Sequence, residues 1–258
     1  LGPPKQEYTV FKGRIAHGLL MAYATYLWTE HFMPRGRWRW LWGTLAALGV
    51  VNLLLMIGGR TGHVVFFALI VLFMYRHWRW QGLLASGLVV VGLALVASYT
   101  SDIFQARMEE MVNDLKRPEA KVITSGGVRL EFYNNTLGII MRHPVLGGGT
   151  GSFIPEYAEL AKEKALYPTN NPHNEFLLIT TQVGLLGLVL LLMLGYRQWR
   201  MSYGLRPEYV AAAQGLVVTM AVGSLFNSLL LDSTEGHFYA LLTGICFGSF
   251  KLSVNSGV

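Results

Sequence analysis

The sequence predicts an all-α protein: a polytopic transmembrane helix bundle with one long helical loop outside the membrane. Three observations predict this fold class. Of the 258 residues, 52% are hydrophobic and only 14% are charged, and the mean hydropathy is +0.39. Soluble domains carry roughly 25% charged residues. The apolar residues also gather in long runs, close to the roughly 20 residues that a membrane-spanning helix needs.

Seven apolar segments are predicted to span the membrane. Backbone amides find no water in lipid, so each segment is expected to be a helix. The segments are residues 15–33, 41–57, 61–75, 82–98, 174–196, 210–231 and 237–250. They divide the chain into a first membrane region (1–98), an outer loop (99–173) and a C-terminal membrane region (174–258). Because the chain begins at Leu1 without a signal peptide, further spans are expected upstream.

Basic residues between the spans predict the orientation. Arginines and tryptophans fill the connections 35–40, 76–80 and 197–206, whereas the opposite short connections contain Arg60 alone. Short arginine-rich loops remain cytoplasmic, so Arg60 and the long loop are expected on the opposite, outward face of the membrane. That placement, away from ATP, argues against most kinases, ATPases and nucleotide-sugar enzymes. The net charge of +6 then reflects membrane topology rather than nucleic-acid binding.

The outer loop is too long for a passive linker. Apolar residues at helical spacing predict an amphipathic helix over 102–117, and a second helix is expected from Ser125, as its cap, to Pro144. Arg129 falls near the start of the second helix, where free N–H groups and a guanidinium would bind an anion. A solvated surface arginine is the simpler alternative. GGGTGSF (147–153) lacks the Gly-Lys-Ser/Thr ending of a phosphate loop, so we interpret it as a tight turn between helices.

Arg60 lies in LLLMIGGRTGHVVFF, with apolar sequence on both sides. A charge at such depth costs a few kcal/mol and needs a partner or a water-filled pocket. Alternatively, an arginine at a hairpin tip extends to lipid headgroups. The single cysteine, Cys246, excludes an intrachain disulfide and argues against a Cys/His metal site.

His173 directly precedes the apolar run 174–196. It either caps that helix or acts as a base, since an imidazole titrates near neutral pH. Asn171 and Asn174 are close enough in sequence to hold its tautomer. Three carboxylates near the outer boundary are candidates to orient the ring: Glu175, Asp232 and Glu235.

Three stretches resemble the O-antigen ligase and O-antigen polymerase family: GGRTG before a span, GGVRLEFYNNTLGIIMRHPVLGGGTGSF, and PHNEFLLITTQVGLLGL. The resemblance covers residues 58–196, and SLFNSLLLDSTEGHFYALLTGICFGSF is similar to the closing spans of the family. It implies a GT-C-like, metal-independent glycosyltransferase of the bacterial inner membrane, with its active site facing the periplasm and no cofactor. The donor would be a glycan on undecaprenyl pyrophosphate, and the acceptor of a ligase would be the lipid A-core oligosaccharide.

By the same resemblance, His173 would be catalytic and Arg60 and Arg129 would bind the pyrophosphate. Supporting roles are expected for Arg14, Asn174, Glu175 and Asp232. One base without a nucleophilic carboxylate predicts a single displacement with inversion. A polymerase or a protein O-oligosaccharyltransferase of the same family remains an alternative. A transporter of lipid-linked sugars is a further alternative, although no inverted pair of broken helices is apparent in the sequence.

Overall fold

The computed structural model describes residues 13–33, 36–102, 104–106, 109, 112 and 125–248. Within these residues the chain forms helices and turns, and no β-strand occurs. Three stretches are long and apolar enough to cross a membrane by length and composition: Arg39–Met56, Arg60–Thr100 and Glu175–Ser202. The prediction of an all-α bundle of membrane helices is confirmed.

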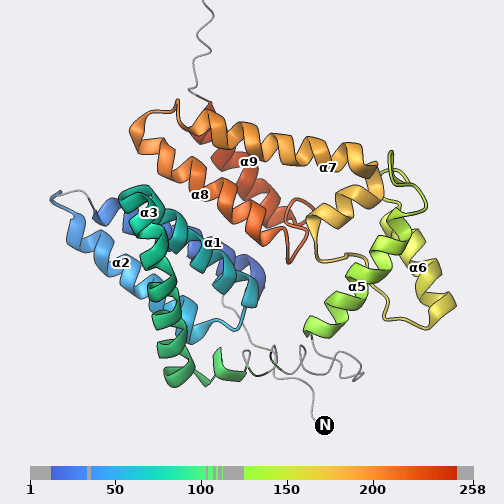
Figure 1. Ribbon diagram of the computed structural model, residues 1–258, viewed down its shortest axis with the longest axis horizontal. Helices are drawn as coiled ribbons and strands as arrows, with labels where there is room; N and C mark the ends of the chain where they lie inside the picture. The colour runs from blue at the N-terminus through green and yellow to red at the C-terminus, as the bar shows by residue number, and fades with distance from the viewer. Residues whose placement is uncertain are drawn as a thin grey trace, which may run out of the picture.

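Figure 1 shows the helices in two groups, with α1, α2 and α3 on one side and α7, α8 and α9 on the other, and with α5 and α6 at one end. α1 packs against α2, α3 and α8, which joins the two groups. The helices are α1 (Arg14–Phe32), α2 (Arg39–Val51) with the π-helical turn η1 (Asn52–Met56), α3 (Arg60–Thr100), α5 (Ser125–Ile140), α6 (Phe153–Lys164), α7 (Glu175–Ser202), α8 (Pro207–Gly223) and α9 (Ser233–Phe247).

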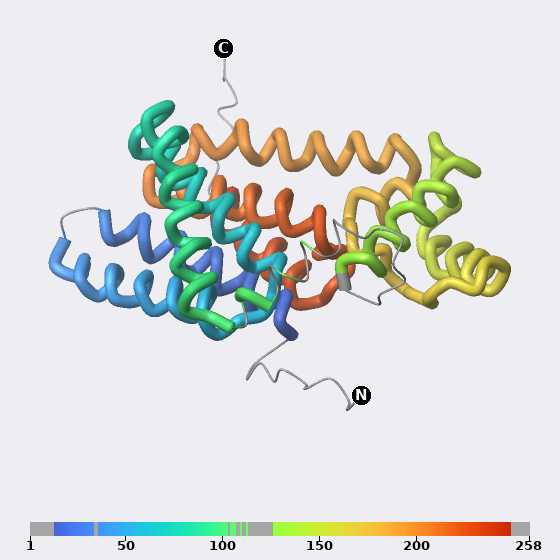
Figure 2. Tube along the Cα trace, turned by 60° about the horizontal axis from the view of Figure 1, so that its bottom comes forward, coloured from blue at the N-terminus to red at the C-terminus, as the bar shows by residue number. Residues whose placement is uncertain are grey.

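α3 contains the two predicted spans 61–75 and 82–98 and is broken between them at Arg79, where φ is +52°. A Cβ added to Gly82 would lie 2.0 Å from the carbonyl oxygen of Met74. Eight residues of straight helix would separate these positions by about 12 Å. The chain therefore folds back at Arg79, and Figures 1 and 2 both show α3 turning back on itself.

α7 corresponds to the predicted span 174–196 but is broken at Gly184, where φ is +71°. At the break, backbone N–H and C=O groups of α7 lose their helical hydrogen-bond partners, and lipid offers no replacement. The turn before α6 provides the missing partners. The carbonyl of Pro144 accepts the N–H of Leu185 at 2.8 Å, and the N–H of Gly148 donates to the carbonyl of Thr181 at 2.9 Å. The glycine-rich stretch thus forms the expected tight turn between helices and also closes the break in α7.

Two segments differ from the sequence prediction. The span predicted at 210–231 was wrong at its C-terminal end, because α8 stops at Gly223 and residues 224–232 form turns. α6 was not predicted; its buried face, with Phe153 and Tyr157, packs on Phe132 of α5. The second outer-loop helix is confirmed as α5, whereas most of the helix predicted at 102–117 lies outside the described residues.

A buried polar network fixes the end of the bundle that carries the arginine- and tryptophan-rich connections. Arg76 donates to Glu30 at 3.0 Å and also to Gln214, and Gln214 donates to Ser202 at 3.1 Å. Residues from α1, α3, α7 and α8 meet in this network. The three basic connections therefore lie at one end of the bundle, and Arg60 lies at the opposite end of the first half of α3.

Candidate active site

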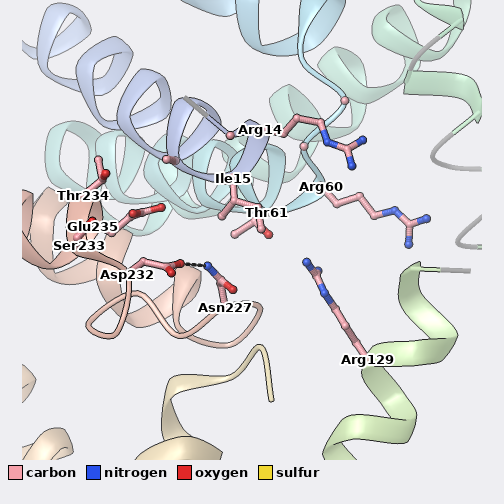
Figure 3. A pocket seen from close by; sticks show the side chains of 14 residues that line it. Arg14, Ile15, Arg60, Thr61, Arg129, Asn227, Asp232, Ser233, Thr234 and Glu235 are labelled. Carbon is pink, nitrogen blue, oxygen red and sulfur yellow. Dashed lines mark hydrogen bonds between the residues drawn. The ribbon is translucent and has the colours of Figure 1, made fainter. Parts of the chain in front are cut away.

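Arg14 and Arg60 lie close together because α1 and α3 approach each other at glycines. A Cβ added to Gly62 would lie 2.7 Å from the Cα of Gly18, and one added to Gly59 would lie 2.9 Å from the carbonyl oxygen of Arg14. Only residues without a side chain fit such backbone contacts. The glycines of GGRTG therefore bring two helix starts together, and its arginine extends from there into a cavity (Figure 3).

Arg129 reaches the same cavity from α5. Burial lowers the pKa of Arg129, and the positive charges of Arg60 and Arg14 lower it further, while Tyr133 acts in the opposite direction. An arginine nevertheless keeps its charge in proteins. Three guanidinium groups therefore lie near enough to interact, and a bound anion would relieve their mutual repulsion.

The cavity has a volume of about 390 Å³, within the range of about 300–1,000 Å³ typical of small-molecule sites. The N-terminal ends of α1, α3 and α9 line it, and the N–H groups of their first turns carry partial positive charge. Figure 3 shows the arginines on one side of the cavity and Asp232 and Glu235 on the other. The cavity thus has a cationic wall suited to an anion and an acidic, hydroxyl-bearing wall opposite.

His173 is held in a strained backbone conformation next to this cavity. Its φ is +56°, in the left-handed region that residues other than glycine seldom adopt. Its N–H donates to Oδ1 of Asn171 at 2.7 Å, and its carbonyl accepts the hydroxyl of Tyr133 at 3.0 Å. Strain of this kind persists only where the surroundings maintain it, and it concentrates at functional sites.

The imidazole of His173 is also fixed from several sides. Its Nδ1 lies 3.0 Å from Oδ1 of Asn227, and the ring of Phe132 stacks on it with centroids 6.0 Å apart. Burial lowers the pKa of His173 below its usual 6.5; Arg129 lowers it as well, whereas the bond to Asn227 and the charge of Asp232 raise it. At pH 7 the neutral ring is therefore favoured, and this is the form that accepts a proton.

The structure gathers some of the predicted site residues and separates others. The cavity wall includes Arg14, Arg60, Arg129 and Asp232. Within the described part of the chain, His173 does not line the cavity, but its partner Asn227 does. One hydrogen bond therefore connects the imidazole to the cavity wall.

Asn174 and Glu175 hold the chain around the site. Asn174 caps α7, and its amide also donates to the carbonyl of Leu225 at 3.1 Å. Glu175 is 1% exposed, and its carboxylate accepts the backbone N–H of Leu230 at 2.8 Å. Both residues therefore anchor the segment 224–232, which supplies Asn227 and Asp232 to the site.

Sequence reasoning missed Asn227 because this residue lies inside the span predicted at 210–231. Of the candidate carboxylates, Asp232 accepts a hydrogen bond from Asn227, the partner of the imidazole, while Glu175 binds backbone. One signal was present: Asn227 and Ser228 interrupt an apolar run five residues before an aspartate. A polar pair at that place is typical of a helix end rather than a continuous span.

A helical membrane protein with a cationic cavity at one end of its bundle is the class that the fold and the site define. Residues 44–192, more than half of the chain, match the family model described as O-antigen ligase. The chain belongs to this family, which places it among the membrane proteins of lipopolysaccharide biosynthesis. The matched region includes Arg60, Arg129 and His173 and ends before Asn227. No curated protein matches the chain.

Proposed function

We propose that this protein is an O-antigen ligase, a glycosyltransferase that moves a glycan from a polyprenyl pyrophosphate to a hydroxyl of the lipid A-core oligosaccharide. The observation that carries the proposal is the convergence of Arg14, Arg60 and Arg129 on one cavity, with a neutral imidazole one hydrogen bond from its wall. Undecaprenyl pyrophosphate is the expected lipid carrier, and the membrane is the expected solvent for its tail.

The arginines suit the leaving group. A guanidinium presents several N–H donors in a plane and binds phosphate oxygens in pairs. Pyrophosphate leaves as an anion whose charge grows as the bond to the sugar breaks, and the helix starts of α1 and α3 contribute further positive potential there. Groups that face the place where charge develops typically make the largest contribution to catalysis. Arg60 and Arg129 are assigned to this role, and Arg14 supports them.

His173 is assigned as the general base. The acceptor hydroxyl oxygen forms a bond to the anomeric carbon, its proton passes to the imidazole, and the bond from that carbon to the pyrophosphate oxygen breaks, with the electron pair leaving on pyrophosphate. One displacement of this kind inverts the anomeric configuration. A positioned base typically contributes about 10²–10⁴-fold to the rate.

The topology of the chain agrees with a reaction on the periplasmic face of the inner membrane. Arginine- and tryptophan-rich connections lie at the end of the bundle marked by Arg76, and such connections remain cytoplasmic. The cavity is found at the end marked by Arg60. A lipid-linked donor and a lipid-anchored acceptor would both reach it from the membrane.

The experiment is glycan transfer by the purified protein with a defined lipid-linked donor and lipid A-core. We expect His173→Ala to lower kcat by about 10²–10⁴-fold with donor binding retained. Arg60→Ala and Arg129→Ala should each lower kcat/KM by about 10²–10³-fold. Arg142→Ala is the matched control, because Arg142 is exposed beyond the end of α5. Transfer by the His173 variant at the wild-type rate would exclude the base role.

The same assay separates the alternatives. Lipid A-linked products identify a ligase, longer lipid-linked chains a polymerase, glycosylated protein a protein O-oligosaccharyltransferase, and the absence of any covalent product a transporter. In the residues that the structure describes, no three His, Cys, Asp or Glu side chains gather as a metal site requires. Parallel reactions with EDTA test directly whether transfer needs a metal ion.

A further inference from the structure

The orientation of the Asn227 amide follows from its two neighbours. Its Nδ2 lies 2.7 Å from a carboxylate oxygen of Asp232, and its Oδ1 lies 3.0 Å from Nδ1 of His173. A carboxylate only accepts hydrogen bonds, so the NH₂ group has to face Asp232. A flipped amide would place two acceptor oxygens against each other. Asn227 therefore presents an acceptor to the imidazole.

We propose that Asn227 is a positioning residue of the transfer reaction. Its amide, oriented by Asp232, fixes His173 in the tautomer that carries the proton on Nδ1 and leaves the lone pair of Nε2 to accept the proton of the acceptor hydroxyl. The proposal rests on the general-base role of His173 proposed above. It assigns to Asn227 an indirect role, because Asn227 acts on the imidazole and not on the substrate.

The surroundings hold this arrangement in place. Asn227 is 3% exposed, so its amide has little freedom to turn. The next residue, Ser228, donates to Oδ1 of Asn171 at 2.8 Å, and the same oxygen accepts the backbone N–H of His173. The segment 224–232 thus contacts the ring of His173 directly and its backbone N–H through Asn171. A neutral histidine takes the tautomer that its hydrogen-bond partner demands.

Two charged groups face the imidazole. Arg129 of α5 disfavours the imidazolium, while Asp232, at the N-terminal boundary of α9, favours it. Removing the Asn227 amide removes a bond that favours the protonated ring and breaks the link to Asp232. The pH at which transfer is half-maximal should therefore fall in Asn227→Ala, while the neutral ring above that pH divides between its two tautomers.

The first test reads the tautomer without any glycan transfer. Proton-coupled ¹⁵N NMR of imidazole-labelled, detergent-solubilised protein distinguishes Nδ1–H from Nε2–H rings, and His173→Gln identifies the relevant resonance among the seven histidines. We expect Nδ1–H in the wild type and a mixture in Asn227→Ala. An Nε2–H ring in the wild type, or an unchanged Nδ1–H ring in the variant, would overturn the proposal and leave the glycosyltransferase assignment intact.

The second test is kinetic. Asn227→Ala should lower kcat by about 10–100-fold and change the KM for the donor less than about two-fold. Ser228→Ala is the control, since it loosens the same segment without touching the ring. Exchanging the pair, Asn227→Asp with Asp232→Asn, restores an acceptor facing Nδ1 and a donor behind it. The exchanged pair should recover Nδ1–H and most of kcat and raise the pH of half-maximal transfer. A loss of kcat of the same size in Ser228→Ala, or no recovery in the folded exchange variant, would overturn the positioning role.

Discussion

Replacing Gly184 with alanine tests whether the break in α7 and the glycine-rich turn hold the site together. An added Cβ at position 184 would lie 2.1 Å from the carbonyl oxygen of Val145 and 2.3 Å from its carbon. Both atoms belong to backbone, so no side chain can move aside. The backbone itself, with φ +71° and ψ −167°, occupies a region essentially restricted to glycine, which costs about 1–3 kcal/mol for any other residue.

The turn 144–149 would have to move away to relieve the contact. Four backbone hydrogen bonds join it to the break in α7, with donor–acceptor distances of 2.8, 2.9, 3.0 and 3.4 Å. Each contributes about 0.5–1.5 kcal/mol net, and more where lipid offers no replacement. Loss of two such bonds, together with the backbone strain, gives about 2–6 kcal/mol of destabilisation.

Thermal unfolding of the detergent-solubilised protein measures this change, and a domain of this size loses about 2–4 °C of Tm for each kcal/mol. Gly195→Ala is the matched control, because Gly195 lies in the same helix with nothing within 4 Å of an added Cβ. That variant should melt at the same temperature as the wild type or slightly higher. A Gly184→Ala variant with an unchanged Tm would refute the backbone contact between the turn and α7.

Three further predictions concern the site and the bundle. Because burial lowers the pKa of His173 below 6.5, the transfer rate should rise with pH and level off after an inflection below 6.5, as a pH–rate profile measures; an inflection above 7 would contradict this. Arg76→Ala should destabilise the protein by up to about 3 kcal/mol, since the nearly buried carboxylate of Glu30 loses its arginine and keeps only the contact with His77 at 3.2 Å. Adding Glu30→Ala should restore part of the Tm. Gly62→Leu should separate α1 from α3 at Gly18 and reduce donor binding, measured with labelled lipid-linked glycan, at unchanged expression.

Local sequence signals identified the helices well, because length and apolarity decide what crosses a membrane. They also made candidates of Arg60, whose charge between two apolar runs has to meet water or an anion, and of Arg129, at the start of a helix, and both line the cavity. They could not identify the break at Gly184. A glycine within a helical pattern is tolerated in most proteins, and only the contact with Val145, about forty residues earlier in the chain, shows why this one matters.

The hydrogen-bonded group of His173, Asn227 and Asp232 was harder to predict, because its members come from segments distant in sequence. Asn227 and the imidazole are separated by 54 positions, and the amide acquires its role only because α8 ends at Gly223 and turns. A hydropathy profile does not show where such a helix ends when apolar residues follow its last turn. The sequence offers Glu175, Asp232 and Glu235 as carboxylates that could orient the ring and does not choose among them. In the structure Glu175 binds backbone, whereas Asp232 accepts a hydrogen bond from Asn227, the partner of the imidazole.

One physical constraint explains why the polar site and the helix ends coincide. In a membrane, irregular backbone is tolerated only where protein covers it or where it lines a cavity. α1, α3 and α9 all begin at the cavity, and the turn segment 224–232 passes between the cavity and His173. The N–H groups of their first turns carry partial positive charge, and the pyrophosphate of the proposed donor would supply acceptors and neutralise the arginines. Because the cavity exists only in the folded protein, binding of the proposed donor there should raise Tm, and this increase should be lost in Arg60→Ala.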